Sequence, residues 1–115
     1  MEVKIYVVKD ELYKKPETDL SNVLNENALN LLDALRNELI NACGGLTVLP
    51  VLKGYWLNEK QICADSKIEI WKCFIDNEDL KAQKIVFGII LCIKETTKQK
   101  SQLYTVNRNI ESYFE

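Results

Sequence analysis

The stretch that decides the fold is residues 27–52, NALNLLDALRNELINACGGLTVLPVL, in which the spacing of apolar residues changes at a pair of glycines. Before the glycines, apolar residues recur every three or four positions, which predicts an amphipathic helix over 25–43. Asn25 or Asn27 can cap its start, and an earlier start within 21–24 stays open. The helix ends at Gly44-Gly45, because glycine readily adopts the left-handed conformation of a C-terminal cap.

The residues after the glycines are mostly apolar and include β-branched Thr47, Val48 and Val51, which predicts a strand over 46–52. Pro50 cannot donate a ladder hydrogen bond, so we expect this strand at a sheet edge or at a bulge. Outward from this region, the same reasoning gives the remaining elements: a first strand over 3–8, a continued strand over 54–57, a turn at 58–61, a returning strand over 66–75, a second helix opened by the acidic residues 76–79, a strand over 102–106, a turn at 107–109 and a short edge strand over 110–114.

This order of strand, helix, hairpin, helix and strand predicts one α+β domain over residues 1–115. Two strands joined by a short turn lie antiparallel, so the central pair forms a hairpin. The order is that of the ferredoxin-like βαββαβ sandwich, an antiparallel sheet with two helices on one face.

The strands predict that the second face of this sheet, the one without helices, is also apolar. We assign one set of alternating positions to the helix side: Val3, Ile5, Val7, Ile68, Ile70, Phe74, Leu103 and Thr105. The opposite set then lies on the face without helices: Tyr6, Val8, Trp71, Cys73, Ile75, Tyr104 and Val106. An aromatic-rich patch on an open sheet is typical of an interaction surface.

Two such faces packed together form a homodimer with twofold symmetry, and a cavity left between them is a natural small-molecule pocket. In the alternative, loops or the C-terminal segment cover the patch in a monomer. The candidate ligand or interface residues are Tyr6, Trp56, Trp71, Cys73 and Tyr104.

Composition argues against several classes of function. The 15 basic and 17 acidic residues are scattered and give a net charge of −2, without the basic stripe of a nucleic-acid binder. The longest apolar run, 85–93, is too short to cross a bilayer, and the first residues go directly into a strand pattern rather than a signal peptide. We therefore expect a cytoplasmic protein that binds neither nucleic acid nor membrane.

The chain has four cysteines and no histidine. The cysteines stand at 43, 63, 73 and 92 without a Cys-x-x-Cys pair, so we expect reduced thiols packed as small hydrophobic side chains, no metal site and no cofactor. Cys63 is the most accessible thiol candidate, but no neighbouring basic residue activates it.

Without histidine, acid–base chemistry falls to carboxylates, lysines or tyrosines. Glu69 is the one carboxylate inside a strand, beside Trp71, and is a weak catalytic candidate. On a buried second face its pKa would rise. In the other interpretation it lies near a strand end, solvated or paired with a lysine.

Three short segments carry a resemblance to a known family: Gly45-Leu46-Thr47-Val48-Leu49, Gly54-Tyr55-Trp56 and Ser66-Lys67-Ile68. Together they resemble a family of small bacterial proteins grouped as a domain of unknown function, with the pattern Gly-(Leu/Phe)-Thr-Val-Leu, Gly-x-Trp and Ser-Lys-Val. The resemblance implies a ferredoxin-like fold and no activity, so it assigns no functional residue.

The sequence therefore favours a non-catalytic binding domain that forms a homodimer, or binds a protein or small molecule, through its open sheet face. The alternative is a cofactor-independent enzyme of the dimeric α+β barrel type, acting on a small apolar or aromatic substrate. In that case Tyr6, Trp56, Trp71 and Tyr104 line the pocket, and Glu69 is the acid or base.

Overall fold

The computed structural model of the chain describes residues 1–14, 19–51 and 53–108. Its elements run in the order β1 (Glu2–Val8), a short 3-10 helix η1 (Asp10–Tyr13), α1 (Asp19–Cys43), β2 (Thr47–Val51), β3 (Gly54–Asn58), β4 (Gln61–Asp65), β5 (Ile68–Phe74), α2 (Leu80–Thr96) and β6 (Tyr104–Asn107).

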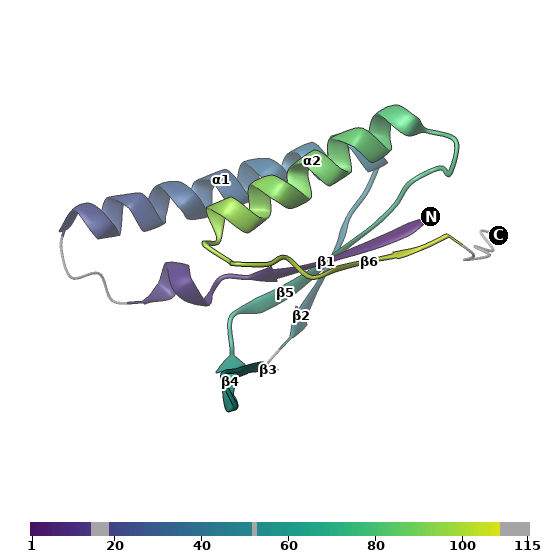
Figure 1. The fold of residues 1–115 in the computed structure, drawn as a ribbon. Coiled ribbons are helices and arrows are strands. Elements are labelled where there is room, and N and C mark those ends of the chain that lie inside the picture. The colour runs from purple at the N-terminus through teal and green to yellow at the C-terminus, as the bar shows by residue number, and fades with distance from the viewer. Residues whose placement is uncertain (15–18, 52, 109–115) are drawn as a thin grey trace.

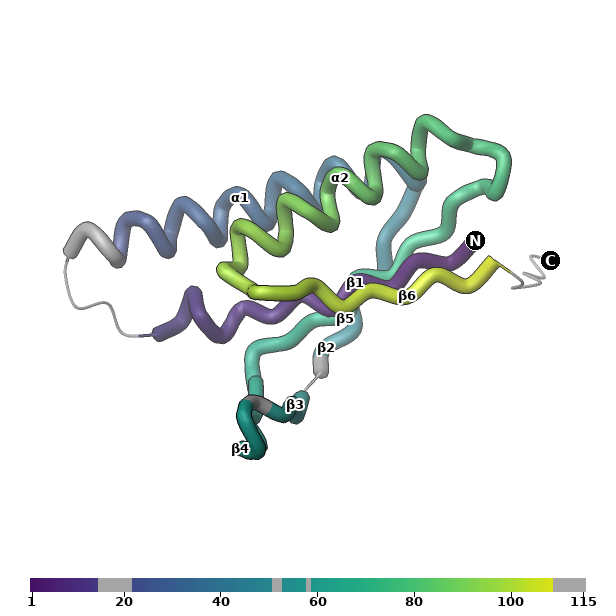
Figure 2. The backbone as a smooth tube through the Cα atoms, viewed as in Figure 1, coloured from purple at the N-terminus to yellow at the C-terminus, as the bar shows by residue number. Residues whose placement is uncertain are grey.

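Four strands form an antiparallel sheet in the order β2-β5-β1-β6. Both helices pack on the same face of this sheet, side by side (Figure 1). This arrangement confirms the predicted ferredoxin-like fold. The strands β3 and β4 form a separate two-stranded hairpin between β2 and β5, and Figure 2 shows it extending from the side of the sheet that faces away from the helices.

The core lies between the sheet and the two helices. Along β1, every second residue is fully buried, namely Val3, Ile5 and Val7, and the residues between them are only partly covered. Each helix presents one apolar stripe to these strands: Leu32, Leu35 and Leu39 from α1, and Ala82, Val86, Ile89, Ile90 and Ile93 from α2. Full burial of one such valine, leucine or isoleucine contributes roughly 1.5–3 kcal/mol to stability.

The sequence predicted the C-terminal end of α1 better than its start. Helix α1 begins at Asp19, six residues before the predicted start, so the expected caps at Asn25 and Asn27 lie inside the helix. Its C-terminal end is as predicted: Gly44 has φ +80° and donates its N–H to the carbonyl of Ile40 at 2.8 Å. The acidic opening of α2 is also confirmed, because the carboxylate of Asp79 accepts the N–H of Ala82 at 3.0 Å.

The predicted hairpin divides into two parts. Its first strand, β2, lies at the sheet edge, one of the two positions expected from Pro50, and pairs with β5 in antiparallel register. Residues 62–65, which lie between the predicted turn at 58–61 and the predicted returning strand, instead form β4 together with Gln61 and pair with β3. Glu59 and Lys60, with φ of 47° and 69°, form the two-residue turn between them, the type of turn that matches the twist of a hairpin.

At the C-terminal end, β6 covers Tyr104–Asn107 rather than the predicted 102–106, so Asn107 belongs to the strand and not to a turn. The predicted edge strand over 110–114 lies outside the described residues.

Candidate interaction surface

Strand register decides which side chains lie on which face, because residues directly opposite each other in an antiparallel pair share a face. In β5, Trp71 lies opposite the buried Ile5, and Cys73 lies opposite the buried Val3. The side chain of Trp71 is therefore in the core and is only 1% exposed, and Cys73 is buried beside it. The prediction that Trp71, Cys73 and Ile75 face away from the helices is wrong.

The same correction applies to β6. Val106 lies opposite Val3 and Tyr104 opposite Ile5, so both are on the helix side of the sheet. The ring of Tyr104 meets the ring of Phe87 on α2 edge-on, with 6.0 Å between the ring centres. Tyr104 thus contacts a helix at the sheet edge instead of belonging to the open face.

The face without helices carries apolar side chains at one end and charged ones at the other. Tyr6 and Val8 lie there, as predicted, opposite Ile70 and Ile68 of β5, and Leu49 of β2 follows on the far side of Ile70. All five side chains are at least partly exposed. At the other end of the same face, Lys4 lies opposite Lys72 and Thr105.

The β3–β4 hairpin adds a second set of apolar side chains. Leu57 and Ile62 face each other across the hairpin and are 70% and 75% exposed, and Tyr55 on the same hairpin face is 68% exposed. A methyl group added at Gly54 would come within 2.6 Å of the Ile68 side chain, so the base of the hairpin lies directly against the apolar end of the sheet.

We use the term apolar face for these two sets together: Tyr6, Val8, Leu49, Ile68 and Ile70 of the sheet, and Tyr55, Leu57 and Ile62 of the hairpin. Exposed apolar side chains in such number are typical of interaction surfaces. The sequence pattern identified Tyr6 and Val8 of this set and the turn at 58–61. It did not predict the strand over 61–65, which places Ile62 opposite Leu57.

The catalytic candidate Glu69 lies on the helix side of the sheet, opposite Val7. Its carboxylate accepts a hydrogen bond from Lys9 at 2.6 Å and one from the indole N–H of Trp71 at 2.9 Å. Burial raises the pKa of Glu69, but these two hydrogen bonds and the charges of Lys9 and Arg36 outweigh it and hold the pKa below its usual value. The interpretation of Glu69 as half of a lysine ion pair is thus confirmed.

The four aromatic residues predicted to line a pocket do not lie together. Tyr6 is on the apolar face, Trp71 is in the core, and Tyr104 is on the helix side at the sheet edge. Trp56 alternates with Tyr55 and Leu57 along β3, so its ring lies on the opposite hairpin face from theirs.

The thiols differ in their surroundings. Cys43, at the end of α1, hydrogen-bonds with Cys73; this contact, together with burial, raises the pKa of Cys73. Cys63 is half-buried in β4, and Cys92 is exposed on α2. Across the described ranges, no group of three or more cysteine, aspartate or glutamate side chains is placed to hold a metal ion, and no helix is long and apolar enough to cross a membrane.

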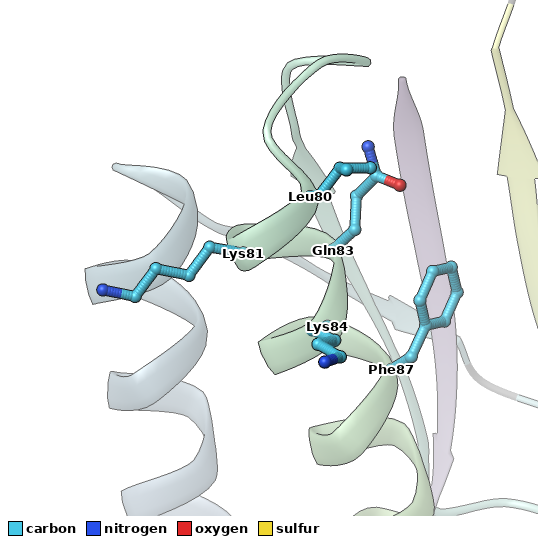
Figure 3. A pocket seen from close by; sticks show the side chains of 5 residues that line it. All are labelled: Leu80, Lys81, Gln83, Lys84 and Phe87. Carbon is cyan, nitrogen blue, oxygen red and sulfur yellow. The ribbon is translucent and has the colours of Figure 1, made fainter.

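A shallow hollow lies on the outer surface of α2 (Figure 3). Its lining residues are Leu80, Lys81, Gln83, Lys84 and Phe87. Their side chains diverge from the helix, with Lys81 directed towards the neighbouring helix and Phe87 towards the strands. Because they do not converge on a common point, this hollow offers no arrangement for chemistry.

No protein-family model matches the chain, and no curated protein does. Among solved structures, the chain is similar to the divalent cation tolerance protein CutA1 from Thermus thermophilus, with 14% sequence identity over 98% of this chain and 88% of that chain and a TM-score of 0.55. A de novo designed protein with a ferredoxin fold aligns over 99% of this chain and 89% of that chain, with 16% identity and a TM-score of 0.39. The likeness to CutA1 agrees with the fold; at this identity it does not extend to function.

Proposed function

We propose that this chain is a non-catalytic binding domain that associates with a second copy of itself through the apolar face. The observation that supports this most strongly is the exposure of Leu57 and Ile62, 70% and 75%, on a hairpin that extends from the sheet. Exposed aliphatic side chains of this size gain free energy when a partner buries them.

The hairpin itself gives a second argument. An isolated two-stranded hairpin is marginally stable in water, and further strands or a packed surface are needed to hold it. Here β3 and β4 pair with each other but with no strand of the four-stranded sheet. The Ile68 side chain lies close to Gly54 at the base of the hairpin. Packing of a second copy against Tyr55, Leu57 and Ile62 supplies the missing surface.

Twofold symmetry suits a surface of this composition. In a twofold dimer the same patch serves both partners, so an apolar patch meets an apolar patch. The charged end of the sheet face, with Lys4 and Lys72, would then lie at the rim, where lysine side chains stay hydrated. A stable interface of this kind buries about 800 Å² on each partner.

The enzyme alternative has no observation in its favour. It required Glu69 and four aromatic rings to meet in a cavity between two sheet faces. Glu69 instead lies on the helix side in an ion pair with Lys9, and the pKa of its carboxyl is lowered, which is the wrong direction for a general acid at neutral pH.

Hydrogen–deuterium exchange at two protein concentrations tests the proposal. We expect backbone amides of residues 54–65 to exchange more slowly in a concentrated sample, where the dimer forms, than in a dilute one. Amides of Val86–Ile93 in α2, which are protected within each protomer, serve as the internal control and should exchange equally in both. Equal and fast exchange of residues 54–65 at both concentrations would show that the hairpin is uncovered in solution and would refute the proposal.

A further inference from the structure

A second hollow, of about 380 Å³, lies between η1 and the base of the hairpin. The side chains that define it are the rings of Tyr13 and Trp56 and the charged groups of Glu11, Lys14, Asp65 and Lys67. Its volume falls in the range of small-molecule sites. Because Trp56 lies on the opposite hairpin face from Leu57 and Ile62, this hollow is separate from the apolar face.

The walls of the hollow are fixed by Asp10. One of its carboxylate oxygens accepts the backbone N–H of Ser66 at 2.8 Å, and the other accepts that of Lys67 at 2.9 Å. These two bonds hold η1 against the chain that leaves the hairpin. A preorganised site loses less conformational entropy on binding than a flexible one.

Nearly every charge around the hollow already has a partner within the chain. Both oxygens of Asp10 are hydrogen-bonded, Glu11 forms an ion pair with Lys14 at 2.6 Å, and the ammonium group of Lys67 lies 5.6 Å from the centre of the Tyr13 ring. Asp65 is different, since it forms no ion pair with any of the described residues.

The surroundings of Asp65 are unfavourable for a negative charge. Burial and the nearby carboxylates of Asp10 and Glu11 raise its pKa, and a hydrogen bond from the Trp56 indole and the charge of Lys14 oppose this only in part. A cation placed against Asp65 would stabilise its charged carboxylate. The lining carries three acidic and two basic side chains, so a ligand with one positive charge would also bring the net charge of the site to zero.

The two rings restrict what kind of cation fits. Both rings line the hollow, and both residues are partly exposed, Tyr13 at 55% and Trp56 at 47%. The position of Lys67 over Tyr13 shows that an ammonium group already lies on one of these rings. A metal ion would need several oxygen or sulfur ligands, whereas an ammonium group needs one carboxylate and gains from a ring face.

We propose that this hollow binds a small organic monocation, an arylalkyl- or alkylammonium compound, with its ammonium group on the carboxylate of Asp65 and its apolar part against Trp56 and Tyr13. The site does not depend on self-association, because its residues lie on a different face of the hairpin. A monomeric protein that binds such a cation would refute the proposed function and leave this inference intact.

Protein-detected NMR titration with three related probes tests the inference. Benzylammonium carries the positive charge, benzyl alcohol is its neutral counterpart, and benzoate is the anion. We expect saturable shifts at about millimolar benzylammonium, centred on residues 10–14 and 64–67, and much weaker binding of the other two probes. Asp65→Asn should weaken benzylammonium binding by about tenfold or more, and Trp56→Leu by about two- to fivefold.

Glu59→Gln removes one carboxylate from the hairpin turn, at a residue that does not line the hollow; it is the matched control and should bind like the unaltered protein. The amide spectra of all three variants report whether the fold is kept. Equal binding of benzyl alcohol or benzoate, unaltered binding by Asp65→Asn, or the absence of saturable binding would each overturn the inference.

Discussion

Replacing Leu57 and Ile62 by serine should dissociate the dimer without unfolding the protomer. The two side chains are 70% and 75% exposed within one chain, so they contribute little to its own stability. Full burial of a leucine or isoleucine is worth roughly 1.5–3 kcal/mol, which leaves about 1–2 kcal/mol for each of these side chains to gain on association.

Twofold symmetry buries four such side chains, two from each protomer, so the double substitution removes about 4–8 kcal/mol of association free energy. Each 1.4 kcal/mol is a factor of ten, so the dissociation constant should rise by at least about a thousandfold. Sedimentation velocity over a dilution series measures this change, and thermal unfolding monitored by circular dichroism reports on the protomer.

Leu91→Ser is the matched control, because Leu91 is a comparably exposed leucine, 63%, on α2 and away from the apolar face. It should leave the dissociation constant unchanged. If the hairpin variant associates as tightly as the unaltered protein, or if the control weakens association equally, the apolar face is not the interface.

Further predictions concern the fold and its titration. Trp71→Ala should lower the free energy of unfolding by about 3–5 kcal/mol in urea denaturation, because this ring is 1% exposed in the core; a loss below about 1 kcal/mol would contradict that placement. The pKa of Glu69 is lowered in the folded state, so its contribution to stability is complete above the unfolded value near 4.5 and is lost as the pH falls through the folded value; Glu69→Gln should remove that part of the acid dependence, and an unchanged pH profile would contradict the ion pair with Lys9. Gly44→Ala should cost about 1–2 kcal/mol because of the positive φ, and unchanged urea denaturation would contradict that backbone conformation. In the folded protein the thiol of Cys73, whose pKa is raised, should react with a thiol reagent far more slowly than exposed Cys92, and equal rates would place Cys73 at the surface.

The fold could be predicted from the sequence because its signals are local. The helical spacing before Gly44 and the alternation of β1 each indicate one type of element, and Pro50 indicates an edge or a bulge. The order of these elements is enough to identify a ferredoxin-like arrangement.

The faces of β5 could not be predicted in the same way. Ile68, Ile70 and Phe74 alternate with Trp71, Cys73 and Ile75, so both sides of the strand carry large apolar side chains. Alternation separates two faces only when one of them is polar. The register of β5 with β1 determines which of its side chains face the helices. That register depends on contacts between residues far apart in the chain.

The candidate site could be predicted only in part, because it also depends on contacts between residues far apart in the chain. Glu69 is a catalytic candidate in the sequence because it is a carboxylate within a strand. Its ion pair with Lys9, 60 residues away, depends on the tertiary structure. The exposed pair Leu57 and Ile62 depends on a turn formed by Glu59 and Lys60, neither of which is a usual left-handed residue. The sequence predicted the turn at 58–61, but it did not predict that residues 61–65 return as a strand paired with β3.

The most direct test of the account is the mass of the unaltered protein in solution. Light scattering at micromolar concentration should give about twice the chain mass of 13.3 kDa, as expected when two apolar faces cover each other. A mass of one chain at every concentration would contradict self-association through this face.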